Sequence, residues 1–262
     1  MPVYNGANFL PQTLNSVLEQ TFNNWELIII NDASTDNSPL IINDFKRDDK
    51  RISLLENNRR LGVAASLNKA LQTAKGKFIA RIDADDTWDK TKLEKQLAYL
   101  EKYPDIDLLA TQFVFLDEIK KKRIHKSQHN SEYEVNANSL VKKNFICHSS
   151  ILVKAEVINE LGGYNEKYKN SEDYDLWLRL LTRYNATILN EPLVKYRIHP
   201  NMASLKRRRQ QAYYSIKARN YAIFNLNYPK KALIYHFPDI WKLMVPDFVI
   251  HLKKRLSKFL NL

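Results

Sequence analysis

Short apolar segments alternate with amphipathic segments along the first 105 residues, and this alternation constrains the fold more than any other feature of the chain. Residues 27–30, 52–55 and 77–82 are brief β-rich runs, and each is followed by apolar residues at helical spacing. Strands and helices that alternate in this way predict βαβ units, right-handed crossovers and a parallel sheet. The sequence therefore predicts an α/β fold.

Three carboxylates stand at the end of the third run. Asp83, Asp85 and Asp86 follow residues 77–82 directly, which is the strand end where an open α/β sheet binds its ligands. Three like charges repel one another, and a divalent cation held through oxygen ligands relieves that repulsion. An isolated group of this kind is also explained by a solvated acidic turn before the helix that starts near Lys90.

Asp32 occupies the equivalent position after residues 27–30. Because both acids follow predicted strands, Asp32 and Asp83 are expected to face one crevice. Taken alone, Asp32 is explained equally well as a turn-forming residue.

A second acidic cluster opens a later helix. Glu172 and Asp173 follow Ser171 and precede the apolar positions of that helix. Ser171 fits an N-cap, and acids in a first turn interact favourably with the helix dipole, so a structural explanation exists. It leaves the Gly-Gly-Tyr turn at residues 162–164 unexplained.

Cysteine content and hydropathy indicate the cellular compartment in which the protein is expected. Cys147 is the only cysteine among 262 residues, which excludes an intrachain disulfide and favours a reducing environment. The sequence has no apolar run long enough to span a bilayer and no signal-peptide pattern at Met1. We therefore expect a cytoplasmic protein.

The positive charge is concentrated at the C-terminal end. Residues 1–203 carry 28 Lys+Arg against 27 Asp+Glu, whereas residues 204–262 carry 13 against 2. This asymmetry predicts an anionic partner, either lipid headgroups or nucleic acid.

The last stretch of the chain favours the lipid. It has an apolar face with basic residues around it, formed by Phe248, Val249, Leu252, Leu256, Phe259 and Leu260. A basic amphipathic helix of this kind predicts peripheral contact with anionic lipid on the inner face of the cell membrane. A helix docked on the rest of the chain or on a second subunit is the alternative. We predict no nucleic-acid partner, because the sequence has no recognisable groove-reading or stacking motif.

Four motifs, taken in order, resemble those of family 2 glycosyltransferases with the GT-A fold. They are residues 1–6, 31–36, 83–86, and 162–164 together with 172–177. The resemblance covers residues 1–203 and implies a Rossmann-like, mostly parallel sheet flanked by helices. It also implies a donor half at about residues 1–105 and an acceptor half at about 106–203. Residues 204–262 fall outside the resemblance, and their own pattern predicts a basic amphipathic helical extension.

The resemblance assigns the nucleotide-sugar donor to the N-terminal motifs. It implies that Tyr4 packs on the nucleobase and that Asp32 accepts a hydrogen bond from a base N–H, which would fit uracil. Arg60, just before Gly62, is a candidate for the diphosphate. A solvated loop arginine beside Arg59 is the alternative for that residue.

The same resemblance assigns the cation. Asp83 would lie near the ribose and the metal, and Asp85 would bind Mn²⁺ or Mg²⁺ that bridges the diphosphate. Oxygen ligands match these hard cations, and the cation offsets the charge that grows on the leaving nucleoside diphosphate. His199, in a segment that closes over the diphosphate in many relatives, would be a metal ligand or a phosphate donor. A surface histidine is the alternative.

Asp173 matches the position that the family uses as catalytic base, with Glu172 as a supporting carboxylate. Inversion needs one base on the acceptor side, placed to take the hydroxyl proton as oxygen attacks the anomeric carbon. A simple helix cap is the alternative for Asp173.

The resulting hypothesis is an inverting, metal-dependent glycosyltransferase. It would move a sugar from a nucleotide donor, most simply a UDP-sugar, to a saccharide or lipid-linked acceptor of a surface polysaccharide or lipopolysaccharide. A nucleotidyltransferase could share the sheet and the acids, but it predicts a Gly-rich basic loop near the N-terminus, where Gly6 is the only glycine. A nucleic-acid-binding protein that uses the basic tail would leave the acidic crevice unexplained.

The first strand is short compared with the family pattern. Family members place several apolar residues before the Pro-Val-Tyr motif, and here only Met1 precedes it. We expect a form with a longer first strand to be more stable.

Overall fold

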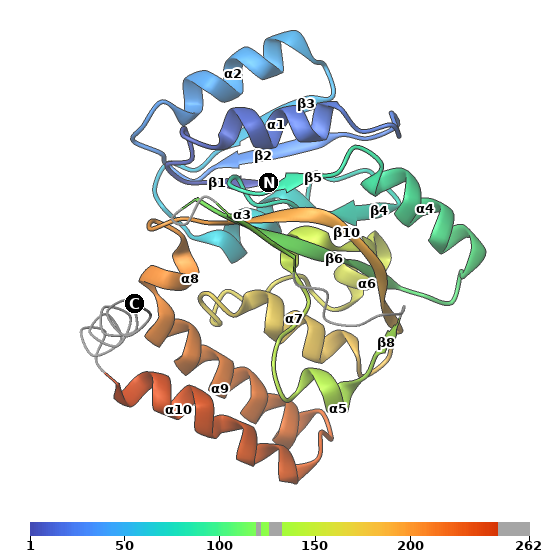
Figure 1. Cartoon of the computed structure of the whole chain (residues 1–262), viewed down its shortest axis with the longest axis vertical. Helices are drawn as coiled ribbons and strands as arrows, with labels where there is room; N and C mark the ends of the chain where they lie inside the picture. Colours follow the sequence, from blue (N-terminus) through green and yellow to red (C-terminus); the bar gives the residue numbers. More distant parts are fainter. Residues whose placement is uncertain (119–121, 126–132, 246–262) are drawn as a thin grey trace.

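The computed structural model describes residues 1–118, 122–125 and 133–245. Its N-terminal part is a three-stranded parallel sheet in the order β1-β2-β3, and this part occupies the top of Figure 1. The strands and the helices between them are β1 (Pro2–Val3), α1 (Leu10–Leu18), β2 (Leu27–Asn31), α2 (Ser38–Asp48), β3 (Ile52–Glu56) and α3 (Val63–Leu71). The alternation predicted from the sequence is confirmed here.

A seven-stranded mixed sheet forms the middle of the molecule. Its order is β4-β9-β6-β10-β5, with β7 paired to β6 and β8 paired to β10. The strands are β4 (Phe78–Ala80), β5 (Thr87–Trp88), β6 (Leu108–Asp117), β7 (Lys122–His125), β8 (Tyr133–Val135), β9 (Leu152–Lys154) and β10 (Ala186–Ile198). The long strands β6 and β10 run parallel, while β4 pairs antiparallel with β9. The α/β fold class is confirmed, but β4 does not extend the parallel ladder.

Shorter helices surround the mixed sheet, and one of them, α7, opens with the second acidic cluster. They are α4 (Lys92–Lys102), α5 (Ala137–Leu140), the 3₁₀ turn η1 (His148–Ser150), α6 (Ala155–Glu160) and α7 (Glu172–Leu180). Trp177 of α7 is fully buried and lies in the main apolar core with Leu108 and Ala110 of β6. The N-terminal end of α7 is therefore rigidly anchored.

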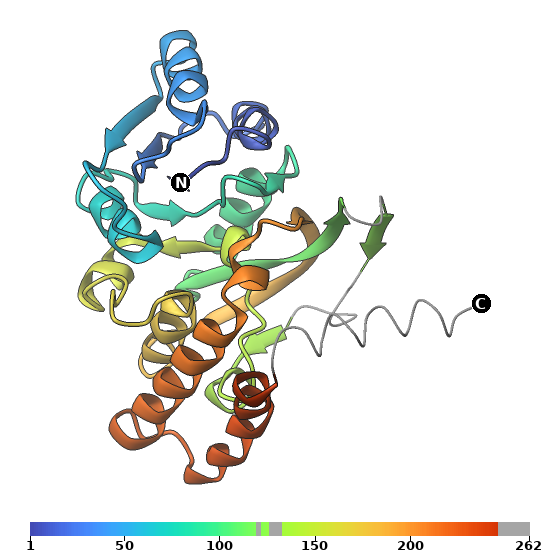
Figure 2. The same ribbon diagram turned by 90° about the vertical axis from the view of Figure 1, so that its left-hand side faces the viewer.

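The described residues end in four helical segments, of which α9 packs on α7 and the others pack on α9. They are α8 (Ala203–Lys206), α9 (Arg208–Asn225), η2 (Lys230–His236) and α10 (Phe237–Met244). Ala218, Ala222 and Ile223 of α9 belong to the same core as Trp177, and Figure 2 shows α9 running along the body. Helix α9 is thus docked on the body, whereas the predicted basic helix at residues 248–260, together with its docking alternative, lies outside the described residues. The domain boundary near residue 203 stays a prediction.

Among the described residues, no helix combines the length and the apolar character needed to cross a bilayer.

A cavity of about 970 Å³ separates β2 from β4. Its lining includes Met1, Leu27 and Ile28 on one side and Phe78 and Ile79 on the other. Pro2 pairs with Ile30 in the parallel ladder, so residues placed before Met1 would run beside this lining. The cavity therefore marks where a longer first strand would lie, and the stability expected from one stays a prediction.

Candidate active site

The turn after β1 is held by the segment that follows β2. Ser38 Oγ accepts a hydrogen bond from the Gly6 amide at 2.9 Å, and Asp36 accepts one from the Ala7 amide at 3.0 Å. A side chain at Gly6 would meet Ala84 at 3.3 Å, so the turn packs closely against the acidic loop. The first two motifs thus form one unit that abuts the third.

The three predicted donor residues of the N-terminal part lie at one edge of the parallel sheet. The Arg60 guanidinium stacks 3.6 Å above the ring of Tyr4, which is 39% exposed. Asp32 is buried, and its carboxylate accepts hydrogen bonds from the Leu61 and Gly62 amides at 2.8 and 2.9 Å and from Asn57 at 2.8 Å. Asp32 therefore fixes the loop that carries Arg60. A nucleobase contact by Asp32 stays a prediction and would use a remaining lone pair of this carboxylate.

The three acids of the central motif converge on one point. Ligand oxygens of Asp83, Asp85 and Asp86 all lie within 4.8 Å of one another. Burial and the neighbouring charge of Asp85 raise the pKa of both Asp83 and Asp86. Their mutual repulsion and burial thus disfavour the charged forms, and the cluster gathers oxygen donors of the type that Mn²⁺ and Mg²⁺ prefer. The residues present fit such a cation.

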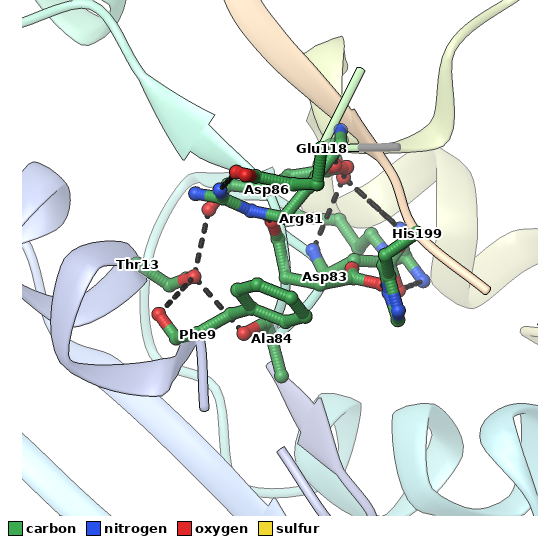
Figure 3. A network of polar contacts seen from close by, with 11 residues as sticks. Phe9, Thr13, Arg81, Asp83, Ala84, Asp86, Glu118 and His199 are labelled. Atoms are coloured by element: carbon green, nitrogen blue, oxygen red, sulfur yellow. Dashed lines mark hydrogen bonds and ion pairs between the residues drawn. The ribbon is translucent and has the colours of Figure 1, made fainter. Parts of the chain in front are cut away.

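Asp83 and Asp86 have different partners, and both acids are labelled in the close-up of Figure 3. Asp83 forms an ion pair with the buried Arg81. Asp86 accepts hydrogen bonds from the Ser149 hydroxyl at 2.5 Å and from the Arg197 amide at 2.9 Å. Asp86, to which the sequence assigned no role, is thus a buried link between the acidic loop, η1 and β10.

The end of β10 lies over the acidic cluster. Arg197 is 3% exposed and donates to the Asp85 carbonyl at 2.7 Å and to Gln12 at 2.7 Å, and its guanidinium also pairs with Glu118. His199 Nε2 lies 2.9 Å from Asp85 Oδ2, and its ring packs on Phe9 at 4.7 Å between centroids. His199 and Asp85 are therefore close enough to bind one cation together, although ligation by either residue stays a prediction.

The candidate base sits at the first turn of α7. Asp173 accepts hydrogen bonds from the Tyr174 amide and from Asn144 Nδ2, both at 2.8 Å. Burial raises the pKa of Asp173, which also responds to the charges of Arg81 and Asp83. Burial and the charge of Asp173 raise the pKa of Glu172 to about 7. The second acidic cluster thus lies within electrostatic reach of the first.

Ser171 stands at the N-cap position of α7 but makes no side-chain capping bond. Its hydroxyl instead contacts the Gln211 carbonyl at 3.1 Å and the Ser215 hydroxyl at 3.0 Å, both on α9. The capping role expected for this side chain is therefore wrong, because the docking of α9 competes for it.

The Gly-Gly-Tyr turn aligns α3, α6 and α7. Gly162 and Gly163 have φ of +73° and +71°, and a side chain at Gly163 would approach Asn68 Oδ1 to 2.7 Å. Asn68 pairs with both the amide and the carbonyl of Tyr164 at 2.9 and 2.8 Å. Arg179 of α7 donates to the Gly163 carbonyl at 2.9 Å. The glycines thus permit a backbone path that ties the candidate base to the donor half.

Several residues of the site were not predicted from the sequence. Ser149, Arg197 and Asn144 each bind an acid of the site from a segment distant in the chain. Tyr164 contacts His148 Nε2 through its hydroxyl at 2.8 Å, beside Trp177. No local pattern marks these contacts, apart from the Gly-Gly turn that precedes Tyr164.

A parallel α/β unit whose strand-end acids face a carboxylate on a later helix defines the class of protein as a GT-A glycosyltransferase. The sequence profile described as "Glycosyl transferase family 2" matches residues 1–162. The chain therefore belongs to glycosyl transferase family 2, and it is a glycosyltransferase.

Named relatives and solved structures agree with this assignment. The Escherichia coli protein "UDP-Glc:alpha-D-GlcNAc-diphosphoundecaprenol beta-1,3-glucosyltransferase WfgD" is 31% identical over 206 residues, covering 78% of each chain. S. aureus TarS 1-349 in complex with UDP superposes with a TM-score of 0.71 at 17% identity, covering 90% of this chain and 69% of that one. The mannosyltransferase PcManGT from Pyrobaculum calidifontis, in complex with GDP-Man and Mn²⁺, gives a TM-score of 0.63 at 18% identity, covering 100% and 79%. The two structures establish the shared fold.

Proposed function

We propose that this glycosyltransferase is an inverting, metal-dependent enzyme that transfers a sugar from a UDP-linked donor to a lipid-linked saccharide during surface polysaccharide synthesis. The observation that carries the proposal is the convergence of Asp83, Asp85 and Asp86, whose ligand oxygens lie within 4.8 Å of one another. The names of the relatives support the substrates: WfgD acts with UDP-Glc on a diphosphoundecaprenol-linked sugar, and TarS is solved with UDP.

The donor would lie along the edge that joins the parallel sheet to the acidic loop. Tyr4 offers an exposed ring for the nucleobase, and Arg60, stacked on it, offers a planar cation for the diphosphate. Asp32 holds the loop that carries Arg60 and so fixes the shape of the base pocket.

Asp85 and His199 would hold the cation, with Asp83 alongside. When bound, Mn²⁺ or Mg²⁺ supplies Lewis-acid stabilisation of the charge on the departing nucleoside diphosphate. The Mn²⁺ in the PcManGT complex supports this use of the fold. The imidazole of His199, packed on Phe9, is fixed in position beside Asp85.

Asp173 would act as the general base on the acceptor side. Its carboxylate is oriented by two hydrogen bonds, and burial raises its pKa toward the range in which a base takes a proton effectively. The acceptor hydroxyl would give its proton to Asp173 as the oxygen attacks the anomeric carbon opposite the diphosphate, which inverts that carbon. Glu172, with a pKa of about 7, would be a supporting carboxylate.

A lipid-linked acceptor lies in a membrane, so the proposal includes peripheral contact with the inner face of the cell membrane. The net positive balance of residues 204–262 supports contact with anionic lipid.

The test is a donor panel assayed with and without Mn²⁺. Turnover of UDP-glucose or UDP-N-acetylglucosamine above GDP- and ADP-linked sugars is expected, with complete loss on chelation and recovery on adding Mn²⁺ back. The product linkage should have the anomeric configuration opposite to that of the donor. Full activity after chelation would contradict the metal assignment, and retention of configuration would contradict the role of Asp173.

A further inference from the structure

The outer face of α10 is apolar and exposed. Phe237, Trp241 and Met244 are 72%, 63% and 73% exposed. Their spacing of four and three residues places them on one side of the helix. Ile234 of η2, immediately before α10, is 67% exposed and adds to this apolar surface. Large apolar side chains clustered this way on a surface mark a contact site.

The inner side of α10 is firmly bound to the body, so the apolar face is held outward. Asp239 is buried and pairs with Arg219 of α9 at 3.1 Å. Arg219 in turn donates to the Val141 carbonyl at 2.9 Å and lies over the Tyr174 ring. Figure 1 shows α10 along the outer side of α9, at the opposite end of the molecule from α2. The exposure of Phe237 and Trp241 therefore follows from a fixed helix orientation.

The surroundings of this face are cationic. Residues 204–245 contain nine Lys+Arg, and their one acid, Asp239, is buried in its ion pairs. Lys230 and Lys231 of η2 and Lys242 of α10 lie next to the apolar positions in the chain. Apolar aromatic side chains with a cationic border complement a bilayer surface that contains anionic lipid.

A second copy of the chain fits this face less well. A symmetric dimer through α10 would bring the exposed Lys230 and Lys231 of both copies toward one another, without an exposed acid on residues 204–245 to offset them. The charges therefore favour lipid headgroups as the partner.

The face also connects directly to the candidate base. Arg208, at the start of α9, donates to the Val245 carbonyl just after α10 at 3.1 Å. One turn further along α9, the Gln211 carbonyl accepts the Ser171 hydroxyl, two residues before Asp173. The C-terminal end of α10 and the N-terminal end of α7 thus lie on the same end of α9.

We propose that the Phe237–Trp241–Met244 face of α10 docks this protein on a bilayer that contains anionic lipid. This inference rests on the proposed function, since docking there presents the first turn of α7 to an acceptor anchored in the membrane. The apolar side chains enter the interface, and the lysines contact the headgroups.

The experiment measures binding of the full chain to vesicles. Unmodified protein should co-sediment with vesicles of phosphatidylcholine and phosphatidylglycerol, weakly with phosphatidylcholine alone, and less at high salt. The double variant Phe237→Ser/Trp241→Ser should bind about tenfold or more weakly. Leu40→Ser is the matched control, because Leu40 is 67% exposed on α2 at the other end of the molecule, and it should bind like the unmodified chain.

Three results would overturn the inference: no binding of the unmodified chain, equal binding by the double variant, or an oligomer in solution that the double variant abolishes. Equal thermal unfolding midpoints for the two variants ensure that lost binding is not lost folding. Donor hydrolysis in vesicle-free solution separates this proposal from the proposed function. Intact hydrolysis without vesicle binding refutes only the docking face, whereas absent hydrolysis with vesicle binding refutes only the proposed chemistry.

Discussion

Replacing Asp173 by Asn tests the proposed base most directly. The substitution keeps the shape of the side chain and removes its capacity to take a proton. A general base contributes about 10²- to 10⁴-fold, so kcat of Asp173→Asn should fall by that factor, which is about 3 to 5 kcal/mol in barrier. Donor affinity should be unchanged, because Asp173 contacts the acceptor side.

The hydrogen bonds of Asp173 complicate this substitution, and the structure offers a remedy. Its two oxygens accept from the Tyr174 amide and from Asn144 Nδ2, both at 2.8 Å. An amide at position 173 can accept only one of these and turns an NH₂ group toward a donor, which costs about 1 to 3 kcal/mol of stability. The exchange Asn144→Asp/Asp173→Asn restores a donor opposite an acceptor, so its stability should return toward that of the unmodified chain.

Initial rates with the best UDP-sugar, donor binding by calorimetry and thermal unfolding distinguish the two effects. Asp173→Asn should be slow and less stable, whereas the exchange variant should be slow and stable. Asp44→Asn, which changes an exposed acid paired with Arg47 on α2, is the control and should keep the full rate. A rate for Asp173→Asn close to that of the unmodified enzyme would refute the assignment. Full recovery of the rate in the exchange variant would refute the claim that the base acts from position 173.

Four further outcomes follow from the same contacts. Burial raises the pKa of Glu172 from 4.5 to about 7, so the folded state binds this proton more tightly and stability falls as pH rises from about 4.5 through 7. Glu172→Gln should therefore stabilise the protein by up to about 3 kcal/mol at pH 8 and by much less at pH 4.5, as measured by urea unfolding. Equal increases in the free energy of unfolding at both pH values would contradict the raised pKa of Glu172. Asp85→Asn should weaken Mn²⁺ binding about tenfold or more in calorimetry, and unchanged binding would remove Asp85 as a ligand. Asp32→Ala removes the hydrogen bonds from Asn57 and from the amides of residues 61 and 62, so it should lower the free energy of unfolding by about 2 to 3 kcal/mol. It should also raise the KM for the donor. A donor KM equal to that of the unmodified enzyme would show that this loop does not shape the base pocket. Three apolar residues added before Met1 should occupy part of the 970 Å³ cavity and raise the unfolding midpoint by several degrees, whereas three serines in the same place should not; equal midpoints would refute the longer-strand expectation.

The parallel part of the fold was predictable because its signals are local. Residues 27–30 predict β2 (Leu27–Asn31), and Gly62 marks the start of α3 with a φ of +96°. The pairing of β4 was not predictable, since its partner β9 lies about 70 residues further on and no turn motif links the two strands. Ser38 likewise binds a distant segment: it is the first residue of α2, and its hydroxyl accepts a hydrogen bond from the Gly6 amide.

The candidate site likewise contains residues that the sequence predicts and residues that it does not. Carboxylates at strand ends and at a helix start are visible in the sequence, because each follows a local pattern that the fold brings to one edge. The groups that orient them come from other segments: Asn144 for Asp173, Ser149 for Asp86 and Arg81 for Asp83. Only the last of these partners is close in the chain, two residues before its acid and, like it, just beyond the end of β4 (Phe78–Ala80).

These partners explain how three adjacent acids can have different roles. Asp83 is paired with the buried guanidinium of Arg81, and Asp86 is held by Ser149 and by the Arg197 amide, so the oxygens of both acids already have partners within the protein. Asp85 is paired with His199, and an imidazole can bind a metal cation as well as a carboxylate. A cation that arrived with a diphosphate could therefore bind Asp85 and His199 in place of their mutual contact, while the bonds from Arg197 to Asp86 and to the Asp85 carbonyl still hold β10 to the acidic loop. Neighbouring acids of one four-residue motif therefore have separate roles. Asp86 links the acidic loop to β10, and Asp85 offers its carboxylate to the cation.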